Sequence, residues 1–517
     1  MTKTQMKRAA SVLLFFAALA ICSPALAQQP GGDKGTSAKS VQRLNKAPVS
    51  HEVLQVQLPR PTETKLKNGL SVIVLEQHKL PTVAFVLWVK GGALADPKDL
   101  PGLAETSAAM LREGTAKRNS SQIATATDQL GATLSTNAAF GSGITSVSIS
   151  GLVESADKMA ELMSDVALNP AFPEPELAKY KSRKLPQLEE QRSDASFLAE
   201  EKFYEVLYRD FPAAVISATP ESVKAITVSD LKKFHDTWFA PNNAILGVVG
   251  DVTQAQALAL ANKYFGGWAM HAVPASTLPP VPQSQPKKAY LIDRPGSVQT
   301  NLVTGNLGIK RTDADYISLV VMNRILGAGA SSRLFLELRE EKGYTYGSYS
   351  GFNANLYPGV VEATSEQRNA VTKAAMDSLL DELRKMREEP VPAAELDESK
   401  RSIVAVFALS LESPTNLLNR WLTVKYYGLP VDYWDTYPAK VNAITAQDIE
   451  QTAKKYIDLD HLQIVVVGDS KQPGTEEKEN AKTIKDVVSG FAPTEMFDAE
   501  GKPMKAKAAA AEKPTGD

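Results

Sequence analysis

Apolar residues with strand-like and helix-like spacing follow one another along most of this chain. Short apolar runs at 72–75 and 83–89 are typical of buried strands, and the Asn-Gly pair at 68–69 just before them favours a tight turn. A helix is expected between Pro101 and Gly114, because proline suits the first helical turn and glycine suits the residue after the last. This region is therefore predicted to hold two strands and a turn, followed by a helix.

An internal repeat appears when two distant segments are compared. Residues 225–227 (Ala-Ile-Thr) recur at 443–445, and the run Val-Val-Gly-Asp at 248–251 recurs at 466–469. In both pairs of segments the offset is 218 residues. Each copy has the pattern of a capped helix that leads into a buried strand, so one domain-sized unit is predicted to occur twice.

The segments outside the two copies have different compositions. Basic residues precede an apolar run at 9–21, and small residues at 25–27 follow it, which is typical of a secretory signal peptide. Prolines crowd 274–286, as in a linker, and the C-terminal end is rich in Ala, Lys and Pro. The predicted organisation is: signal peptide 1–27, flexible lead 28–57, N-terminal domain 58–270, linker 271–287, C-terminal domain 288–490 and disordered tail 491–517.

Cysteine usage and charge narrow the classes of function. Cys22 is the only cysteine among 517 residues, and Ile21 stands where a lipid-attachment signal needs a small side chain, so we expect cleavage after Ala27 and an exported, periplasmic protein without cysteine. Disulfides, thiolate metal sites and cysteine nucleophiles are then excluded. A net charge of −2 and 22% charged residues indicate a soluble globular protein and no nucleic-acid partner. No later segment is long and apolar enough to span a membrane.

The stretch 331–352 has the most suggestive chemistry. It is expected to form a short helix capped by Ser331 or Ser332, to stop at Gly343 and to continue as a strand in which Tyr344 and Tyr346 share a face. Arg339, near the helix end, and Tyr346 could bind a peptide carbonyl and a developing oxyanion. On spacing alone, however, a helix-dipole partner and a packing tyrosine explain the same residues better.

The order of residues in this stretch resembles a known signature. Residues 331–335 (Ser-Ser-Arg-Leu-Phe), 338–343 (Leu-Arg-Glu-Glu-Lys-Gly) and Tyr346 resemble the C-terminal signature of the pitrilysin/insulinase family of zinc metallopeptidases, which includes the mitochondrial processing peptidases. The resemblance implies two related α+β domains, each a mainly antiparallel sheet covered by helices, facing each other across a cavity. It also implies that Arg339 and Tyr346 bind substrate and stabilise the transition state at a zinc ion held by the other half of the enzyme.

The zinc motif of that family is missing from this chain. The residues around the helix at 101–114 resemble the frame of the inverted motif His-x-x-Glu-His, but Glu105, Ala108 and Ala109 occupy the positions of the two histidines and the general base. Glu189 is the candidate remnant of the third ligand. No two histidines are three to five residues apart, which excludes a helical zinc pair; the five are His51, His78, His235, His271 and His461. His235 is interpreted as a structural residue at a helix end.

These observations lead to one hypothesis and one alternative. The hypothesis is a non-catalytic, substrate-binding subunit of an exported metallopeptidase, which binds no cofactor itself and supplies Arg339 and Tyr346 to the zinc site of a partner chain. Small-subunit members of the family work as such pairs. The alternative is a scaffold or peptide-binding protein that kept the fold and lost catalysis altogether. A self-sufficient enzyme with a different site is disfavoured because no nucleophile motif or ligand cluster is present.

Overall fold

The computed structural model describes residues 54–275, 277–477 and 480–504. The predicted signal peptide, Cys22, His51 and nearly all of the predicted lead lie outside these residues. The N-terminal half contains β1 (Thr62–Lys65), β2 (Ser71–Glu76), β3 (Thr82–Lys90), α2 (Leu103–Met110), α3 (Ser120–Gln129), β4 (Thr133–Asn137), β5 (Ile144–Leu152), α4 (Ala156–Leu168), α5 (Glu174–Arg192), α6 (Ala195–Tyr208), α7 (Pro220–Ala225), α8 (Val228–Trp238), β6 (Ala244–Gly250) and α9 (Gln254–Phe265).

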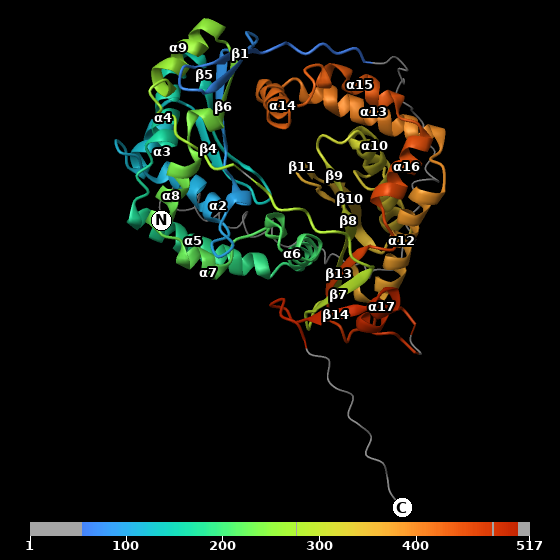
Figure 1. Cartoon of the computed structure of the whole chain (residues 1–517). Coiled ribbons are helices and arrows are strands. Elements are labelled where there is room, and N and C mark those ends of the chain that lie inside the picture. Colours follow the sequence, from blue (N-terminus) through green and yellow to red (C-terminus); the bar gives the residue numbers. More distant parts are fainter. Residues whose placement is uncertain (1–53, 276, 478–479, 505–517) are drawn as a thin grey trace, which may run out of the picture. The chain divides into compact units, whose positions relative to one another are not determined.

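The C-terminal half follows after residues 266–287, where the described residues form no helix or strand. It contains β7 (Lys288–Asp293), β8 (Gln299–Leu307), β9 (Ile309–Lys310), α10 (Tyr316–Leu326), α11 (Arg333–Phe335), η7 (Leu336–Glu341), β10 (Thr345–Phe352), β11 (Ala354–Asn355), β12 (Val360–Arg368), α12 (Thr372–Glu388), α13 (Ala393–Ser410), α14 (Pro414–Tyr427), α15 (Tyr433–Ala443), α16 (Ala446–Tyr456), β13 (Gln463–Gly468), α17 (Ile484–Phe491) and β14 (Thr494–Phe497). Figure 1 shows the chain in sequence colours, with elements labelled where there is room.

Each half is built on one six-stranded sheet. The strand order is β1-β2-β6-β3-β5-β4 in the first half and β10-β12-β8-β13-β7-β14 in the second. In the first sheet only β2 and β6 pair in parallel, and in the second only β13 with β7 and β7 with β14 do so. The remaining neighbours are antiparallel. The predicted α+β class with mainly antiparallel sheets is confirmed. The strands β2 and β3 are not neighbours, however, because β6 lies between them.

The internal repeat also holds at the level of structure. The central strands β6 and β13 are buried along their whole length, as expected for strands covered on both faces. The helices α8 and α16 precede them, and each begins with the same capping box. Thr227 and Asp230 form this box in α8, and Thr445 and Asp448 form it in α16.

Each half contributes one helix that packs on the sheet of the other half. Helix α6 of the first half packs on strands β13 and β8 of the second, and α14 of the second half packs on β6 of the first. Phe203 of α6 is fully buried with the C-terminal strand residues Val465 and Val467, and Leu418 of α14 is fully buried with the N-terminal strand residue Val249. Each sheet is therefore covered on one face by its own helices and on the other by a helix from the other half.

Two findings concern the ends of the chain and membranes. Residues 494–497 form β14, which pairs with β7, and Phe497 is buried, so the prediction of disorder from 491 onwards is wrong there. The Ala- and Lys-rich composition that suggested a tail belongs to later residues, and 505–517 lie outside the described part. None of the helices described here combines the length and apolar character that crossing a membrane requires.

Candidate functional site

The helix α2 occupies the place predicted for the zinc helix, and a carboxylate fixes its N-terminus. Its N-cap residue, Gly102, adopts a left-handed conformation with φ of 90° and has no side chain with which to cap the helix. Asp96 does this instead: its carboxylate accepts hydrogen bonds from the backbone N–H groups of Gly102 (2.8 Å) and Ala104 (2.9 Å). Burial raises the pKa of Asp96 to about 7, although these N–H donors favour the charged form.

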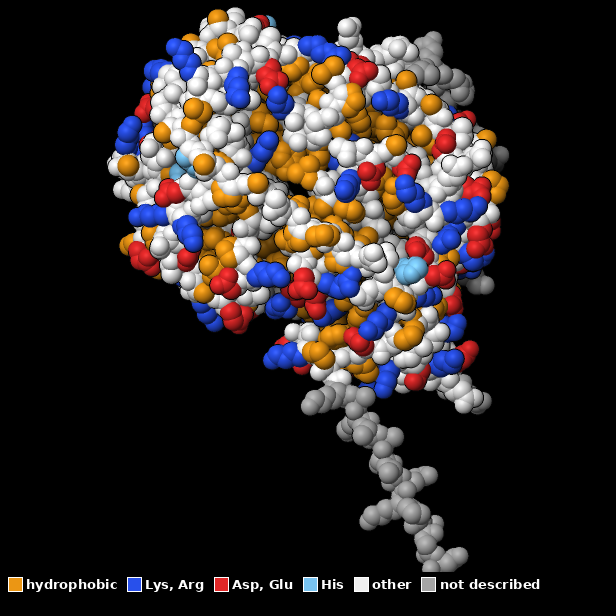
Figure 2. Space-filling model, in the orientation of Figure 1, with side chains coloured by type: hydrophobic (Ala, Val, Ile, Leu, Met, Phe, Trp, Pro, Cys, Tyr) orange, Lys and Arg blue, Asp and Glu red, His pale blue; other side chains and the backbone are white. Residues whose placement is uncertain are grey.

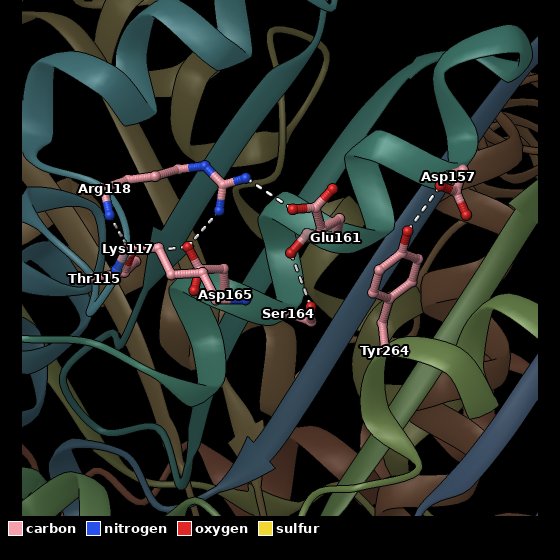
Figure 3. A network of polar contacts seen from close by, with 8 residues as sticks. All are labelled: Thr115, Lys117, Arg118, Asp157, Glu161, Ser164, Asp165 and Tyr264. Carbon is pink, nitrogen blue, oxygen red and sulfur yellow. Dashed lines mark hydrogen bonds and ion pairs between the residues drawn. The ribbon is translucent and has the colours of Figure 1, made fainter.

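A polar network fixes the segment that follows α2 (Figure 3). Asp165 of α4 accepts hydrogen bonds from Thr115 Oγ1 at 2.8 Å and from Arg118 Nη1 at 2.6 Å. Arg118 also donates to Glu161 at 2.9 Å. Because only 3% of Asp165 is exposed, this ion pair is shielded from water and holds the segment rigidly against α4.

The former zinc-motif positions carry an ion pair to a neighbouring helix. Glu105 Oε1 accepts a hydrogen bond from Lys184 Nζ of α5 at 2.6 Å. Ala108 is buried and Ala109 is partly buried, and their methyl groups can neither bind a metal nor transfer a proton. The residues at this site therefore do not fit a zinc ion.

Glu189, the candidate remnant of the third zinc ligand, does not face the zinc-motif positions of α2. It is exposed, and it follows Lys184 by five positions, which turns its side chain by roughly 140° around an α-helix. Lys184, and not Glu189, faces Glu105. Among residues 54–275, 277–477 and 480–504, no group of three or more His, Cys, Asp or Glu side chains could hold a metal ion.

The second candidate region begins with a short helix of unusual form. One turn of α-helix at α11 continues as a π-helix at η7, and Gly343 ends it with a left-handed φ of 64°. Ser332 is the N-cap residue, but its hydroxyl donates to Gly329 O at 2.6 Å rather than capping the helix. Arg339, in the last turn, donates from Nη1 to the backbone carbonyl of Tyr346 at 2.7 Å. The structure therefore brings the two predicted site residues together.

Tyr346 lies at a β-bulge on the edge strand of the C-terminal sheet. Thr345 pairs with Gln367 and Ser348 pairs with Ser365, so β10 has one more residue than β12 over this interval. The side chain of Tyr346 is 84% exposed. Tyr344 precedes the strand and packs against the C-terminal core, so the prediction that both tyrosines share one face is wrong. The alternation that it assumed is interrupted by the bulge.

A cleft of about 490 Å³ adjoins Tyr346. The first turns of α6 and the strands β8, β10 and β12 line it, and no lysine or arginine is among the described residues that do so. Glu200 and Glu362 are two of its carboxylates, and Glu362 Oε2 is buried without a hydrogen-bond partner. Burial, together with the charge of Glu200, raises the pKa of Glu362 to about 7. The cleft thus combines exposed aromatic and hydroxyl groups with carboxyl groups that lack a cation.

Two histidines have clear local roles. His235 is buried at the end of α8, with Nε2 2.9 Å from Ala167 O and the ring stacked on Phe239. Burial lowers the pKa of His235, consistent with the predicted structural role. His78 is exposed between Asp251 and Glu76, and its hydrogen bonds to these carboxylates, first to Asp251, raise its pKa.

On the face of the molecule drawn in Figure 2, neither positively nor negatively charged side chains dominate. In Figure 2, lysine and arginine side chains are interspersed with aspartate and glutamate side chains over this face. This distribution agrees with the small net charge of −2. It gives no electrostatic footprint for a polyanion on that face.

Comparisons with known proteins assign this architecture to a family. Residues 71–221 match the family described as insulinase, peptidase family M16, and residues 225–403 match the peptidase M16 inactive domain. The non-peptidase homolog YmxG of Helicobacter pylori is 24% identical over 405 residues, which are 78% of this chain and 92% of that protein. The uncharacterized zinc protease YmxG of Bacillus subtilis is 21% identical over 355 residues, 68% of this chain and 85% of that protein.

Solved structures show the same fold. A peptidase M16 inactive domain from Pseudomonas fluorescens superposes with a TM-score of 0.74 at 26% identity and covers 79% of this chain and 98% of its own. The periplasmic protease PqqL from Escherichia coli superposes with a TM-score of 0.68 at 15% identity, over 89% of this chain and 50% of its own. This chain therefore belongs to peptidase family M16, the insulinase family, and the residues at its zinc-motif positions fit a non-catalytic member.

Proposed function

We propose that this protein is the non-catalytic, substrate-binding subunit of an exported M16 zinc metallopeptidase. A zinc-bearing partner chain would supply the metal and the general base. This chain would supply Arg339 and Tyr346, which bind the peptide and stabilise charge during cleavage. The periplasmic location of one structural relative, PqqL, supports an exported protein of this kind.

The exposed Tyr346 on an edge strand is the observation that carries this proposal. Because β10 has a neighbour on one side only, its other side can accept an extended peptide as an added strand. The bulge directs the Tyr346 phenol outward, and Arg339 is fixed beside it through the Tyr346 carbonyl. The two groups are thus held side by side next to a cleft of about 490 Å³.

One observation favours the alternative of a scaffold or peptide-binding protein. The Arg339 guanidinium is engaged within its own chain: Nη1 binds the Tyr346 carbonyl, and Cζ lies 5.1 Å from the centre of the Phe335 ring. These contacts suffice to stabilise the bulge without any catalytic role. The name of the Helicobacter pylori relative, a non-peptidase homolog, is compatible with both functions.

The decisive experiment measures peptidase activity on an unstructured peptide. The chain is assayed alone and mixed with an M16 protein that has an intact His-x-x-Glu-His motif and is encoded by a neighbouring gene, with and without a zinc chelator. We expect activity only in the mixture, and chelation should abolish it. Silence in the mixture would favour the scaffold, and chelator-sensitive activity from this chain alone would contradict both functions.

Substitutions in the mixture test the two named residues. Arg339→Ala and Tyr346→Phe should each lower turnover by about a hundredfold, the usual cost of losing a transition-state donor. Arg368→Ala is the matched control, because Arg368 ends the neighbouring strand β12 with 65% of its side chain exposed. Thermal melting of each variant separates lost turnover from lost folding. Unchanged turnover in both Arg339→Ala and Tyr346→Phe would exclude the proposed supply of these groups.

A further inference from the structure

The residues at the zinc-motif positions of this chain do not fit the zinc ion that the family implies. Of the three motif positions, only Glu105 has a side chain that can bind a cation, and Ala108 and Ala109 present methyl groups. A single carboxylate facing a neighbouring helix would be left with an uncompensated charge. Such a charge is costly when it is partly shielded from water.

Lys184 compensates this charge. Its ammonium group lies 2.6 Å from Glu105 Oε1, and only 17% of the Lys184 side chain and 30% of the Glu105 side chain are exposed. The two residues belong to different helices and are 79 positions apart in the sequence. The contact therefore joins α2 to α5, the same pair of helices that the family resemblance assigns to the zinc ligands.

The surroundings of this ion pair are shielded from water. Glu105 Oε2 is buried without a hydrogen-bond partner. Tyr180 lies one helical turn before Lys184 on α5, and burial followed by the charge of Glu105 raises its pKa to about 12. The Glu105 carboxylate therefore makes a positive charge favourable at this point.

We propose that Lys184 is an internal replacement for the metal ion, and that it occupies the place on α5 from which a third zinc ligand would reach α2. The assignment replaces Glu189, whose side chain lies on another face of the helix. It deepens the proposed function by explaining how the non-catalytic half keeps its helices together without metal. It concerns only residues of this chain, so its test does not depend on a partner.

The proposal is tested by rebuilding the site in the full chain. The triple variant Glu105→His, Ala109→His, Lys184→Glu restores two imidazoles and one carboxylate, the donor set of a zinc site with an open position. Zinc content after dialysis and zinc titration by calorimetry are the readouts. We expect one zinc per triple-variant chain and a zinc-dependent rise in melting temperature, with no stoichiometric zinc on the natural chain.

A matched pair of variants distinguishes Lys184 from Glu189. The double variant Glu105→His, Ala109→His, which keeps both Lys184 and Glu189, should bind zinc at least roughly tenfold more weakly than the triple variant. Adding Glu189→Gln to the triple variant should leave the zinc affinity unchanged. Equal affinity of the double and triple variants, or loss of zinc through Glu189→Gln, would overturn the proposal.

A second measurement keeps the proposal testable if the rebuilt site does not fold. Lys184→Met and Glu105→Gln are made singly and together, and their melting temperatures form a double-mutant cycle. Lys184→Met alone should lower the melting temperature, because it leaves Glu105 without its cation, and adding Glu105→Gln should restore most of the loss. Additive effects of the two substitutions would show that Lys184 does not compensate Glu105.

Discussion

The zinc-motif site of the N-terminal half and the cleft of the C-terminal half differ in whether a cation is paired with their carboxylates. In the N-terminal half, Glu105 is paired with Lys184 and Asp165 with Arg118. In the C-terminal half, the cleft carboxylate Glu362 has a buried oxygen atom without a partner, and among the described lining residues no lysine or arginine compensates it. The zinc-motif site thus holds an internal cation, whereas the described residues that line the cleft include a shielded carboxyl group and no cation.

This difference agrees with the roles proposed for the two halves. A site that has lost its metal is stable only if its remaining charge is compensated, and internal ion pairs provide this compensation. A ligand-binding cleft instead keeps polar groups that are unsatisfied until a partner arrives, and it reduces stability as a consequence.

Substitutions in α6 and α14, which each pack on the sheet of the other half, have the largest expected effects. They test whether the two halves are equivalent in packing. Phe203 and Leu418 are both fully buried, each on the sheet of the other half. Truncation leaves a cavity, so Phe203→Ala should lower the free energy of unfolding by about 3–5 kcal/mol and Leu418→Ala by about 2–5 kcal/mol. Urea denaturation measures both changes.

If α6 and α14 are equally important for packing, both substitutions should destabilise the whole chain in a single unfolding transition. Leu409→Ala is the matched control, since Leu409 of α13 is 67% exposed and its truncation should cost little. A loss confined to one of the two buried positions would mean that one helix is only loosely attached, and the comparison of equivalent halves would fail.

The charge comparison is tested next at Asp165. Asp165→Ala removes the acceptor of both Thr115 and Arg118 and leaves the Arg118 guanidinium without its shielded partner (Figure 3). We expect a loss of about 3 kcal/mol in the free energy of unfolding. Asp157→Ala is the control in the same helix, because Asp157 is 54% exposed and its contacts with Lys263 and Tyr264 lie at the surface, so its loss should cost clearly less stability. Equal effects would show that shielding does not distinguish these pairs.

The sequence was sufficient to predict the internal repeat and the residues that cap or end helices. The capping residues at Thr227 and Thr445 lie one offset apart and both cap helices, and Gly343 ends its helix in the left-handed conformation that glycine adopts easily. These features depend on a few neighbouring residues, so short-range patterns are sufficient to predict them. The loss of the zinc ligands was equally readable, because it depends only on residue types at three positions.

Contacts between distant segments could not be predicted in this way. Lys184 lies on a helix rich in charged residues, where a lysine resembles any solvated side chain, and only the packing of α5 against α2 brings it to Glu105. The insertion of β6 between β2 and β3 and the bulge at Tyr346 likewise result from pairing with strands elsewhere in the chain. Local periodicity does not specify which strands become neighbours.

A pH experiment sharpens the charge comparison at Glu362. Its pKa is raised to about 7 in the folded chain by burial and by Glu200, whereas an ordinary glutamate titrates near 4.3. The protonated form is thus favoured on folding, and its stabilising contribution is complete below about pH 4 and lost as the pH rises through 7. Glu362→Gln should therefore stabilise the chain by about 1–3 kcal/mol at pH 8 and by much less at pH 4.

Melting temperatures of the natural chain and the variant at both pH values measure this difference. Glu366→Gln is the matched control on the same face of β12, because Glu366 is exposed to water. A Glu362→Gln variant that is equally stabilised at pH 4 and pH 8 would show that the cleft carboxyl is not the titrating group.

The two capping boxes give the smallest effect and the most direct comparison of the halves. Thr227 Oγ1 and Thr445 Oγ1 accept the hydrogen bonds of Asp230 N–H and Asp448 N–H at 3.3 Å and 3.1 Å. Since both caps are exposed and have the same geometry, Thr227→Ala and Thr445→Ala should each lower the free energy of unfolding by about 1 kcal/mol, and together by about the sum. Thr→Ser at either position keeps the hydroxyl and should cost less. Unequal losses measured by urea denaturation would mean that the repeated helices contribute differently to a single folding transition, despite their common origin in sequence pattern.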